Sequence, residues 1–306
     1  MNSTKKLGSD KAWSQYWKTG VITSFSDTYS ANYEGFLSNY WTSFCEQHDL
    51  GNSSILDVGT GNGAIINLIE HTLATKNLKA LSLVGIDSAE IIDSNRTSTL
   101  IGEMKAESMG FDDDTFDFVV SQYGFEYSEV EKSIFEIARV LRNGGRINFL
   151  CHCSDSIIVQ ENILIYKCNK ECYEMNVFDA FKSVLELLEN NMNTAHTSEE
   201  DCFNESMSFI YQKYGEVIFS TGFPQFVKEV LHQPKNKIKF LEQYIKNLDE
   251  SQVRLEDLIN AAITDEKKRL IVSFLKQAGF KNVESVEKYT GKQLIGVEFK
   301  GMLQER

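Results

Sequence analysis

The fold is decided at ILDVGTGNGAI, residues 55–65, where a short apolar run ends in an acid and glycines follow at every second position. A glycine-rich turn between a first strand and its helix lets the backbone approach a ligand, because no Cβ intrudes. The helix N-terminus behind the turn offers free N–H groups that favour negative charge. The pattern therefore predicts a strand, a ligand-binding turn and a helix.

Two features separate this turn from a pyrophosphate site. Dinucleotide sites use the spacing G-x-G-x-x-G, whereas Gly59, Gly61 and Gly63 alternate with single residues. Asp57 stands before the first glycine, where an acid would repel a pyrophosphate but could orient a cationic or amino-bearing ligand. Asp87 ends the next apolar run, and a carboxylate there can accept both ribose hydroxyls. S-adenosylmethionine matches these features, because it carries a sulfonium, an amino group, a carboxylate and a ribose.

Strand-like and helix-like segments alternate between residues 54 and 152. Apolar runs at 54–58 and 116–122 favour strands, and residues 131–141 have the apolar spacing of a helix. Ser88 is expected to open a further helix as its N-cap. Such alternation predicts a parallel sheet with helices on both faces. Near the C-terminus, alternating residues on both sides of Thr290 predict an antiparallel hairpin.

We therefore expect an α/β fold with a doubly wound, mostly parallel seven-stranded sheet, an antiparallel C-terminal hairpin, N-terminal helices and a helical insertion. The insertion is predicted because strand signals stop after about residue 156 and apolar residues then follow helical stripes. It is a candidate lid, acceptor-binding region or dimer surface. The expected domains are an N-terminal helical cap at 1–50, a cofactor-binding core at 51–155, the insertion at 156–260, and a C-terminal helix with two strands at 261–306.

Composition excludes several classes of protein. With 42% hydrophobic and 25% charged residues, the chain is typical of a soluble globular protein. No apolar run reaches the roughly 18 residues of a membrane span, and the N-terminus lacks a signal-peptide pattern, so we expect a cytoplasmic protein without a membrane partner. A formal charge of −13 argues against nucleic acid as a partner. The six cysteines fit no common zinc spacing, so we expect free thiols and no metal.

About half of the chain resembles the class I S-adenosylmethionine-dependent methyltransferases, whose motifs occur here in order and at suitable spacing. The resemblance implies S-adenosyl-L-methionine as cofactor and S-adenosyl-L-homocysteine as product. Where the family often has an acid that meets the adenine amino group, this chain has Lys105. The matching segments are LDVGTGNG (56–63), LVGIDSA (83–89), MGFDDDTFDFVVSQ (109–122), IARVLRNGGRINF (137–149) and FLKQAGFKNVESV (274–286).

The resemblance and the strand ends together give a set of cofactor contacts. Ala106 and Glu107 follow Lys105 and are assigned to the adenine. Ser121 and Gln122 end the fourth strand, and ligands of open α/β sheets bind outside the carboxyl ends of the strands. The expected cofactor-binding residues are Asp57, Gly59, Thr60, Gly61, Gly63, Asp87, Ser88, Ala106, Glu107, Ser121 and Gln122.

Glu126 and His152 are the candidates for a general base, which a methyl transfer needs only when the acceptor must lose a proton. A helix-start acid and a structural histidine are the alternative interpretations of these two residues. Aromatic faces attract sulfonium and ammonium groups, so Tyr16 and Trp17 are candidates for a lid over the cofactor. Tyr127 is a candidate for the acceptor pocket, although core packing explains each ring equally well.

The function that these features favour is methyl transfer to a small-molecule acceptor by in-line displacement. A protein- or peptide-directed methyltransferase, a non-catalytic S-adenosylmethionine-binding protein and an NAD-dependent oxidoreductase are the alternatives. The glycine spacing and Asp57 argue against the oxidoreductase. A homodimer through the helical insertion is a further expectation.

Overall fold

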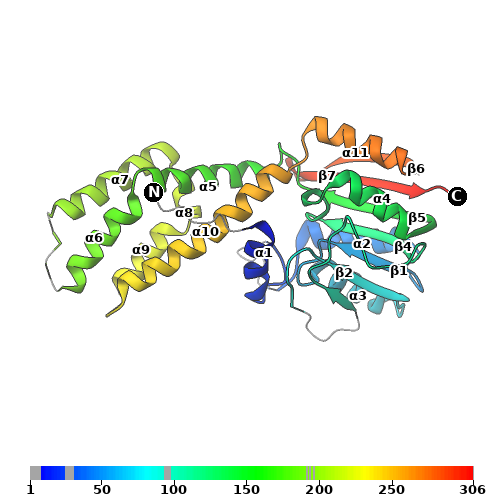
Figure 1. Cartoon of the computed structure of the whole chain (residues 1–306), viewed down its shortest axis with the longest axis horizontal. Helices are drawn as coiled ribbons and strands as arrows, with labels where there is room; N and C mark the ends of the chain where they lie inside the picture. The colour runs from blue at the N-terminus through cyan, green and yellow to red at the C-terminus, as the bar shows by residue number, and fades with distance from the viewer. Residues whose placement is uncertain are drawn as a thin grey trace. The chain divides into compact units, whose positions relative to one another are not determined.

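The chain folds into two compact units. Met1–Val159 and Asn260–Arg306 form the first unit, and Gln160–Ile259 form the second. Figure 1 shows that the strands belong to the first unit and that the second is built of helices. The computed structural model describes residues 8–24, 31–92, 98–190, 192, 194–195 and 197–305.

The first unit contains a sheet with the predicted topology. Within the described residues it has seven strands in the order β3-β2-β1-β4-β5-β7-β6. The pairs among β1 to β5 are parallel, and β7 pairs antiparallel with both β5 and β6. The expected doubly wound sheet with its C-terminal hairpin is confirmed. The strands are β1 Ser54–Val58, β2 Ser82–Ile86, β3 Thr99–Ile101, β4 Phe116–Gln122, β5 Leu141–Cys151, β6 Phe280–Thr290 and β7 Gln293–Leu303.

Helices cover both faces of the sheet because successive side chains of a strand point to opposite faces. Ile55 of β1 packs in one hydrophobic cluster with residues of α2 and α3, whereas Leu56 and Val58 pack in another with residues of α4 and α11. A strand buried on both faces requires a continuous apolar run, which is the reason for the sequence pattern of β1. These four helices are α2 Gly35–Gln47, α3 Ala64–Thr75, α4 Val130–Val140 and α11 Asp265–Gln277.

Two short helices lie near the carboxyl ends of the strands: α1 Ser9–Lys18 and the 3₁₀ helix η1 Phe125–Tyr127. The helix expected to open at Ser88 is not present in residues 88–92, and its remainder lies outside the described residues. The Ile92 N–H, which a helix starting at Ser88 would bond to the Ser88 carbonyl oxygen, donates instead to Asn62 Oδ1 at 2.9 Å. Other side chains accept from the donors that precede it. Asp87 Oδ1 accepts from Ala89 N at 2.9 Å, and the side chain of Ser14 accepts from Glu90 N at 2.9 Å.

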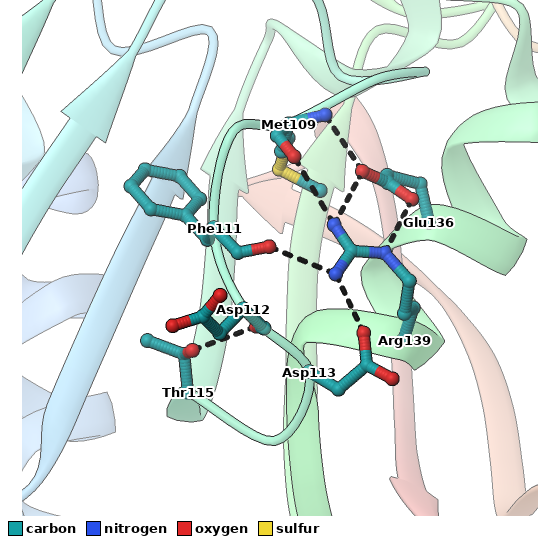
Figure 2. A network of polar contacts seen from close by, with 7 residues as sticks. All are labelled: Met109, Phe111, Asp112, Asp113, Thr115, Glu136 and Arg139. Carbon is teal, nitrogen blue, oxygen red and sulfur yellow. Dashed lines mark hydrogen bonds and ion pairs between the residues drawn. The ribbon is translucent and has the colours of Figure 1, made fainter.

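Arg139 of α4 fixes the loop between β3 and β4 (Figure 2). Its guanidinium donates to the carbonyl oxygens of Phe111 and Met109 at 2.8 and 3.1 Å. It also donates to both carboxylate oxygens of Glu136 at 2.8 and 2.9 Å, and to Asp113 Oδ1 at 2.7 Å. These hydrogen bonds hold the pKa of the Glu136 carboxyl below its ordinary value. The loop that carries the expected adenine contacts is therefore anchored at residues 109–113, just after those contacts.

The second unit has a hydrophobic core of its own. Phe178, Phe181 and Leu185 lie on one stripe of α6, as their helical spacing predicts, and pack with Phe223 and Leu241 from other helices of the unit. Among the described residues, every helix is too short or too polar to cross a bilayer. The helices that make up or border this unit are α5 Ile157–Glu174, α6 Val177–Glu189, α7 Ser198–Tyr214, α8 Val217–Ser220, α9 Phe223–Leu231 and α10 Lys237–Ala261.

Candidate functional site

Asp57 is a buried acid with no hydrogen-bond partner. It is fully buried at the end of β1, and neither of its carboxylate oxygens has a hydrogen-bond partner. The pKa of Asp57 is raised to about 7, chiefly by burial; the Thr60 hydroxyl offsets part of the rise, and the nearby charge of Asp87 adds a smaller one. A buried carboxylate without partners costs free energy. A positively charged ligand beside Asp57 would reduce that cost.

Asp87 holds the glycine turn in place from the end of β2. Its Oδ2 accepts from Gly61 N at 2.8 Å, and its Oδ1 accepts from Ala89 N at 2.9 Å. Burial raises the pKa of Asp87 to about 6, although these two hydrogen bonds lower it. Each carboxylate oxygen can accept a second hydrogen bond, so Asp87 can support the turn and still accept from a ligand.

The glycines of the turn have left-handed backbones, with φ of +72° at Gly59, +51° at Gly61 and +83° at Gly63. A Cβ on Gly59 would lie 2.6 Å from the Cα of Gly124, so the space there is filled by protein backbone. A Cβ on Gly61 would lie 2.5 Å from the indole of Trp17. The missing Cβ therefore gives room to the Gly124 backbone at Gly59 and to an aromatic ring at Gly61. A close approach of this turn to a ligand stays a prediction.

Replacing Gly124 with Ala is expected to lower the free energy of unfolding by about 1–3 kcal/mol, as overpacking does in other cores. The added Cβ would lie 2.8 Å from both Gly59 Cα and Val58 O, and neither backbone atom can move freely. Denaturant unfolding measures the change. Gly110→Ala is the control, because its nearest neighbour is Met104 Cε at 3.7 Å. Equal stability of the two variants would contradict the expectation.

Helix α1 lies against the glycine turn. The Asn62 side-chain amide donates to the carbonyl oxygens of Trp17 and Val21 at 2.9 and 2.7 Å. Lys18 forms an ion pair with Glu90 at 2.7 Å. Trp17 is buried on Gly61, and Asn62, which is not among the residues predicted from the sequence, anchors it. A lid role for Trp17 stays a prediction. The sequence feature that could have indicated this anchor is the amide side chain of Asn62 between two glycines of the turn.

Other lid and cofactor candidates also have protein partners. The Tyr16 hydroxyl donates to the Thr23 carbonyl oxygen at 3.0 Å, within its own N-terminal segment. Ser88 Oγ donates to Asp10 Oδ1 at 3.1 Å and so joins the loop after β2 to α1. The side chain of Thr60 is buried, and its hydroxyl lies against Gly85 of β2. Ligand contacts by these residues stay predictions.

The end of β4 carries two polar residues that brace the fold. Ser121 Oγ donates to the Val58 carbonyl oxygen at 2.7 Å and accepts from Phe125 N at 2.9 Å, which ties β1 to η1. Gln122 Oε1 accepts from Trp41 Nε1 at 2.7 Å, whereas its amide nitrogen is buried without a partner. The cofactor roles of Ser121 and Gln122 stay predictions.

The two residues assigned to the adenine differ in accessibility. Ala106 is buried in the core cluster beneath the loop. Glu107 is half-buried, and its Oε1 accepts from Glu129 N at 2.5 Å, just before α4. The Glu107 carboxylate thus helps to begin that helix. Its contact with an adenine remains a prediction.

Glu126 and His152 lie in direct contact, although they come from η1 and from the end of β5. Glu126 Oε1 accepts from the His152 backbone N–H at 2.7 Å and lies 2.9 Å from His152 Nδ1. Both side chains are buried, and Glu126 Oε2 and His152 Nε2 have no hydrogen-bond partner. The arrangement is that of a carboxylate orienting an imidazole, which the sequence could only suggest as two separate candidates.

A series of aromatic rings connects His152 to the glycine turn. The His152 and Tyr127 ring centroids are 6.2 Å apart, and Tyr127 lies 5.8 Å from Trp13 in an edge-to-face arrangement. Trp13 stacks on Trp17 at 6.0 Å, and Trp17 packs on Gly61. Trp13 was not selected from the sequence. The rings give this edge of the sheet a lining that favours flat or cationic groups.

Residues 56–149 match the family model described as a methyltransferase domain. This segment is a class I methyltransferase domain. It includes β1, β2, β3, β4 and most of β5, with the glycine turn, Asp57, Asp87 and Glu126. The match stops shortly before His152 and does not include α1.

The chain is also similar to several known proteins. The uncharacterized methyltransferase YcgJ of Bacillus subtilis is 28% identical over 129 residues, which are 36% of this chain and 48% of that protein. The chain thus spans about half the length of this curated relative. A protein from Methanococcus maripaludis is 13% identical, with a TM-score of 0.46 over 100% of this chain and 98% of that one. An S-adenosylmethionine-dependent methyltransferase from Mesorhizobium loti is 16% identical, with a TM-score of 0.33 over 39% and 56% of the two chains.

Proposed function

We propose that this chain transfers a methyl group from S-adenosylmethionine to a small-molecule acceptor. The observation that carries the proposal is the buried carboxylate of Asp57, which has no hydrogen-bond partner beside a glycine turn of the methyltransferase domain. Such a carboxylate fits a ligand that brings a positive charge and N–H donors. S-adenosylmethionine brings both.

The residues present fit the cofactor at several points. Asp57 would hold the amino group, directly or through water, and Asp87 would accept the ribose hydroxyls. The N-terminus of α3, which begins after Gly63, would favour the carboxylate. When bound, the cofactor supplies a methyl group on a positively charged sulfur. The chain's part is to align that group with the acceptor, and well-oriented systems gain about 7–11 kcal/mol in this way.

The aromatic lining supports a small acceptor. Trp13, Tyr127 and Trp17 lie close together at the edge where the methyl group would be presented. Helix α1 is fastened over the turn by Asn62 and by the ion pair of Lys18 with Glu90. A site closed by such a helix favours an acceptor that can be enclosed over one that remains attached to a folded protein.

Asp87→Asn is expected to weaken binding of S-adenosylmethionine and S-adenosylhomocysteine about tenfold to a hundredfold. The substitution removes a charged acceptor, whose hydrogen bonds are worth about 1.5–3 kcal/mol, and its amide cannot accept from both Gly61 N and Ala89 N. Calorimetric titration with the two adenosyl ligands and NAD measures the effect. Asp112→Asn is the control, because Asp112 is exposed.

The titration and a subsequent turnover assay together distinguish the candidates. Binding of both adenosyl ligands supports the proposal, and the next step is turnover with a panel of small acceptors and peptides. Binding of NAD without adenosyl ligands would overturn it. Tight adenosyl binding without turnover of any acceptor would identify a non-catalytic binding protein.

A further inference from the structure

His152 presents one ring nitrogen to a partner that the protein does not provide. The ring is buried, yet Nε2 has no hydrogen-bond partner. On the other side of the ring, Nδ1 lies 2.9 Å from Glu126 Oε1. A carboxylate only accepts hydrogen bonds, so the proton of the neutral ring belongs on Nδ1. Nε2 is then left with a lone pair that can accept a proton.

The surroundings hold the ring in this orientation. Tyr123 stacks on it with a centroid distance of 4.1 Å and an interplanar angle of 22°. Glu126 Oε1 also accepts the His152 backbone N–H, which fixes the carboxylate relative to the ring. Burial lowers the pKa of Lys267 of α11, and the charge of Glu126 offsets part of that effect, so the two charges interact. The neighbouring thiols are Cys151 and Cys153, and burial raises the pKa of both.

We propose that His152 is the general base of the transfer, that Glu126 is its positioning residue, and that the acceptor is a neutral amine, thiol or hydroxyl bearing a proton. The inference rests on the proposed function, because it assigns a role within the same site. An acceptor without a proton to lose would need no base. Nor would it satisfy the buried lone pair of Nε2.

The step balances with the residues present. The acceptor's proton moves to His152 Nε2 as the bond between the acceptor heteroatom and the methyl carbon forms. The bond between that carbon and sulfur breaks, and its electron pair remains on sulfur. Glu126 stabilises the resulting imidazolium, which afterwards returns its proton to solvent. No oxidant, reductant or further reactant is needed.

Nitrogen NMR of the histidine rings tests the inference without requiring turnover. The chain has five histidines, and His152→Gln assigns the signal of His152. In the full chain, both alone and with S-adenosylhomocysteine, we expect the proton on Nδ1 and a bare Nε2. Glu126→Gln is expected to give a mixture of both tautomers. A proton on Nε2 in the wild-type chain would overturn the proposal.

Matched probes then test the acceptor class. Phenol, aniline and propanethiol carry a proton on the heteroatom, whereas anisole, N,N-dimethylaniline and methyl propyl sulfide do not. At least one of the first group is expected to shift the Nε2 signal, and its methylated counterpart is not. Equal shifts from both members of every pair, or no shift from any probe, would overturn the inference.

Kinetics with the probe that shifts the signal separates base from structural residue. His152→Gln is expected to lower kcat by about 10²–10⁴-fold while the affinity for S-adenosylhomocysteine and the KM of the probe change little. His71→Gln, at an exposed position on α3, is the control. An unchanged kcat in His152→Gln would overturn the proposal. Failure of the wild-type chain to bind S-adenosylhomocysteine, with the His152 tautomer as expected, would instead reject the proposed function.

Discussion

Asp57→Asn is expected to stabilise the ligand-free protein at pH 8 by about 4 kcal/mol and to weaken cofactor binding. Asp57 has a pKa of about 7 in the folded chain because it is buried without partners, against an ordinary value of 3.8. Each pKa unit corresponds to about 1.4 kcal/mol of difference between the two protonation states. Asparagine has nearly the same shape and carries no charge, so it removes the cost of burying the ionised group.

The contribution of Asp57 to the free energy of unfolding is expected to fall as the pH rises. Between pH 4 and 7 the folded chain keeps the Asp57 proton, whereas the unfolded chain has released it. Stability supplied by this group is therefore complete below about pH 4 and falls as the pH rises through about 7. Denaturant unfolding at pH 5, 6.5 and 8 should show a steeper decline in the wild-type chain than in Asp57→Asn. Parallel profiles for the two would contradict the expectation, and Asp112→Asn controls for the loss of an exposed charge.

Asp57→Asn should also change how much S-adenosylmethionine stabilises the protein. A ligand that brings a positive charge to Asp57 favours its ionised form, and the neutral amide of the variant cannot provide the negative charge that such a ligand needs. We therefore expect S-adenosylmethionine to raise the stability of the wild-type chain at pH 8 more than that of the variant. Under the proposed function, the ligand would supply the partner that this destabilising carboxylate lacks in the protein.

Trp17→Ala is expected to speed amide hydrogen exchange in α1 about a hundredfold. Trp17 is 7% exposed and packs on Gly61. Truncating a buried Trp to Ala typically costs about 3–5 kcal/mol, and each 1.4 kcal/mol corresponds to about a factor of ten in an equilibrium constant. The loss of stability should be confined to α1, because this helix has only 10 residues and keeps few other contacts, among them buried Ala12, the Trp13–Tyr127 ring pair and several polar contacts. Opening of a peripheral element can cost far less than global unfolding.

Exchange followed by mass spectrometry over residues 9–24 measures this change. Leu81→Ala is the control, because Leu81 is 67% exposed and its truncation removes no buried contact. Faster exchange confined to α1 would support its role as a movable cover over the glycine turn. Unchanged exchange in α1, or faster exchange throughout the strands, would contradict it.

The sheet could be predicted from the sequence because its signals are local. A strand buried on both faces favours consecutive apolar residues, and β1 has Ile55 and Leu56 while β4 has the run FVV at 118–120. The hairpin of β6 and β7 has alternating residues on both sides of a glycine turn, and Gly291 there has a φ of +60°. The helix expected at Ser88 was wrong for residues 88–92, because side chains distant in sequence capture the backbone donors of this segment.

The candidate site was predictable residue by residue, but its contacts were not. The glycine spacing singled out Gly59 and Gly61 alike, yet the first packs on Gly124 and the second on Trp17. Neither partner can be read from the turn itself, since each comes from a distant segment.

By itself, the sequence determined the order of strands and helices, the glycine turn and the acids that end β1 and β2. These features depend on the spacing of apolar residues and on backbone conformations that glycine permits, both of which are properties of short segments. The tertiary structure alone decided that Glu126 orients His152, that Asn62 fastens α1, and that Asp57 is left without a partner. Parallel strands bring their carboxyl ends to one edge of the sheet, so residues far apart in the chain acquire a common environment that no local pattern records.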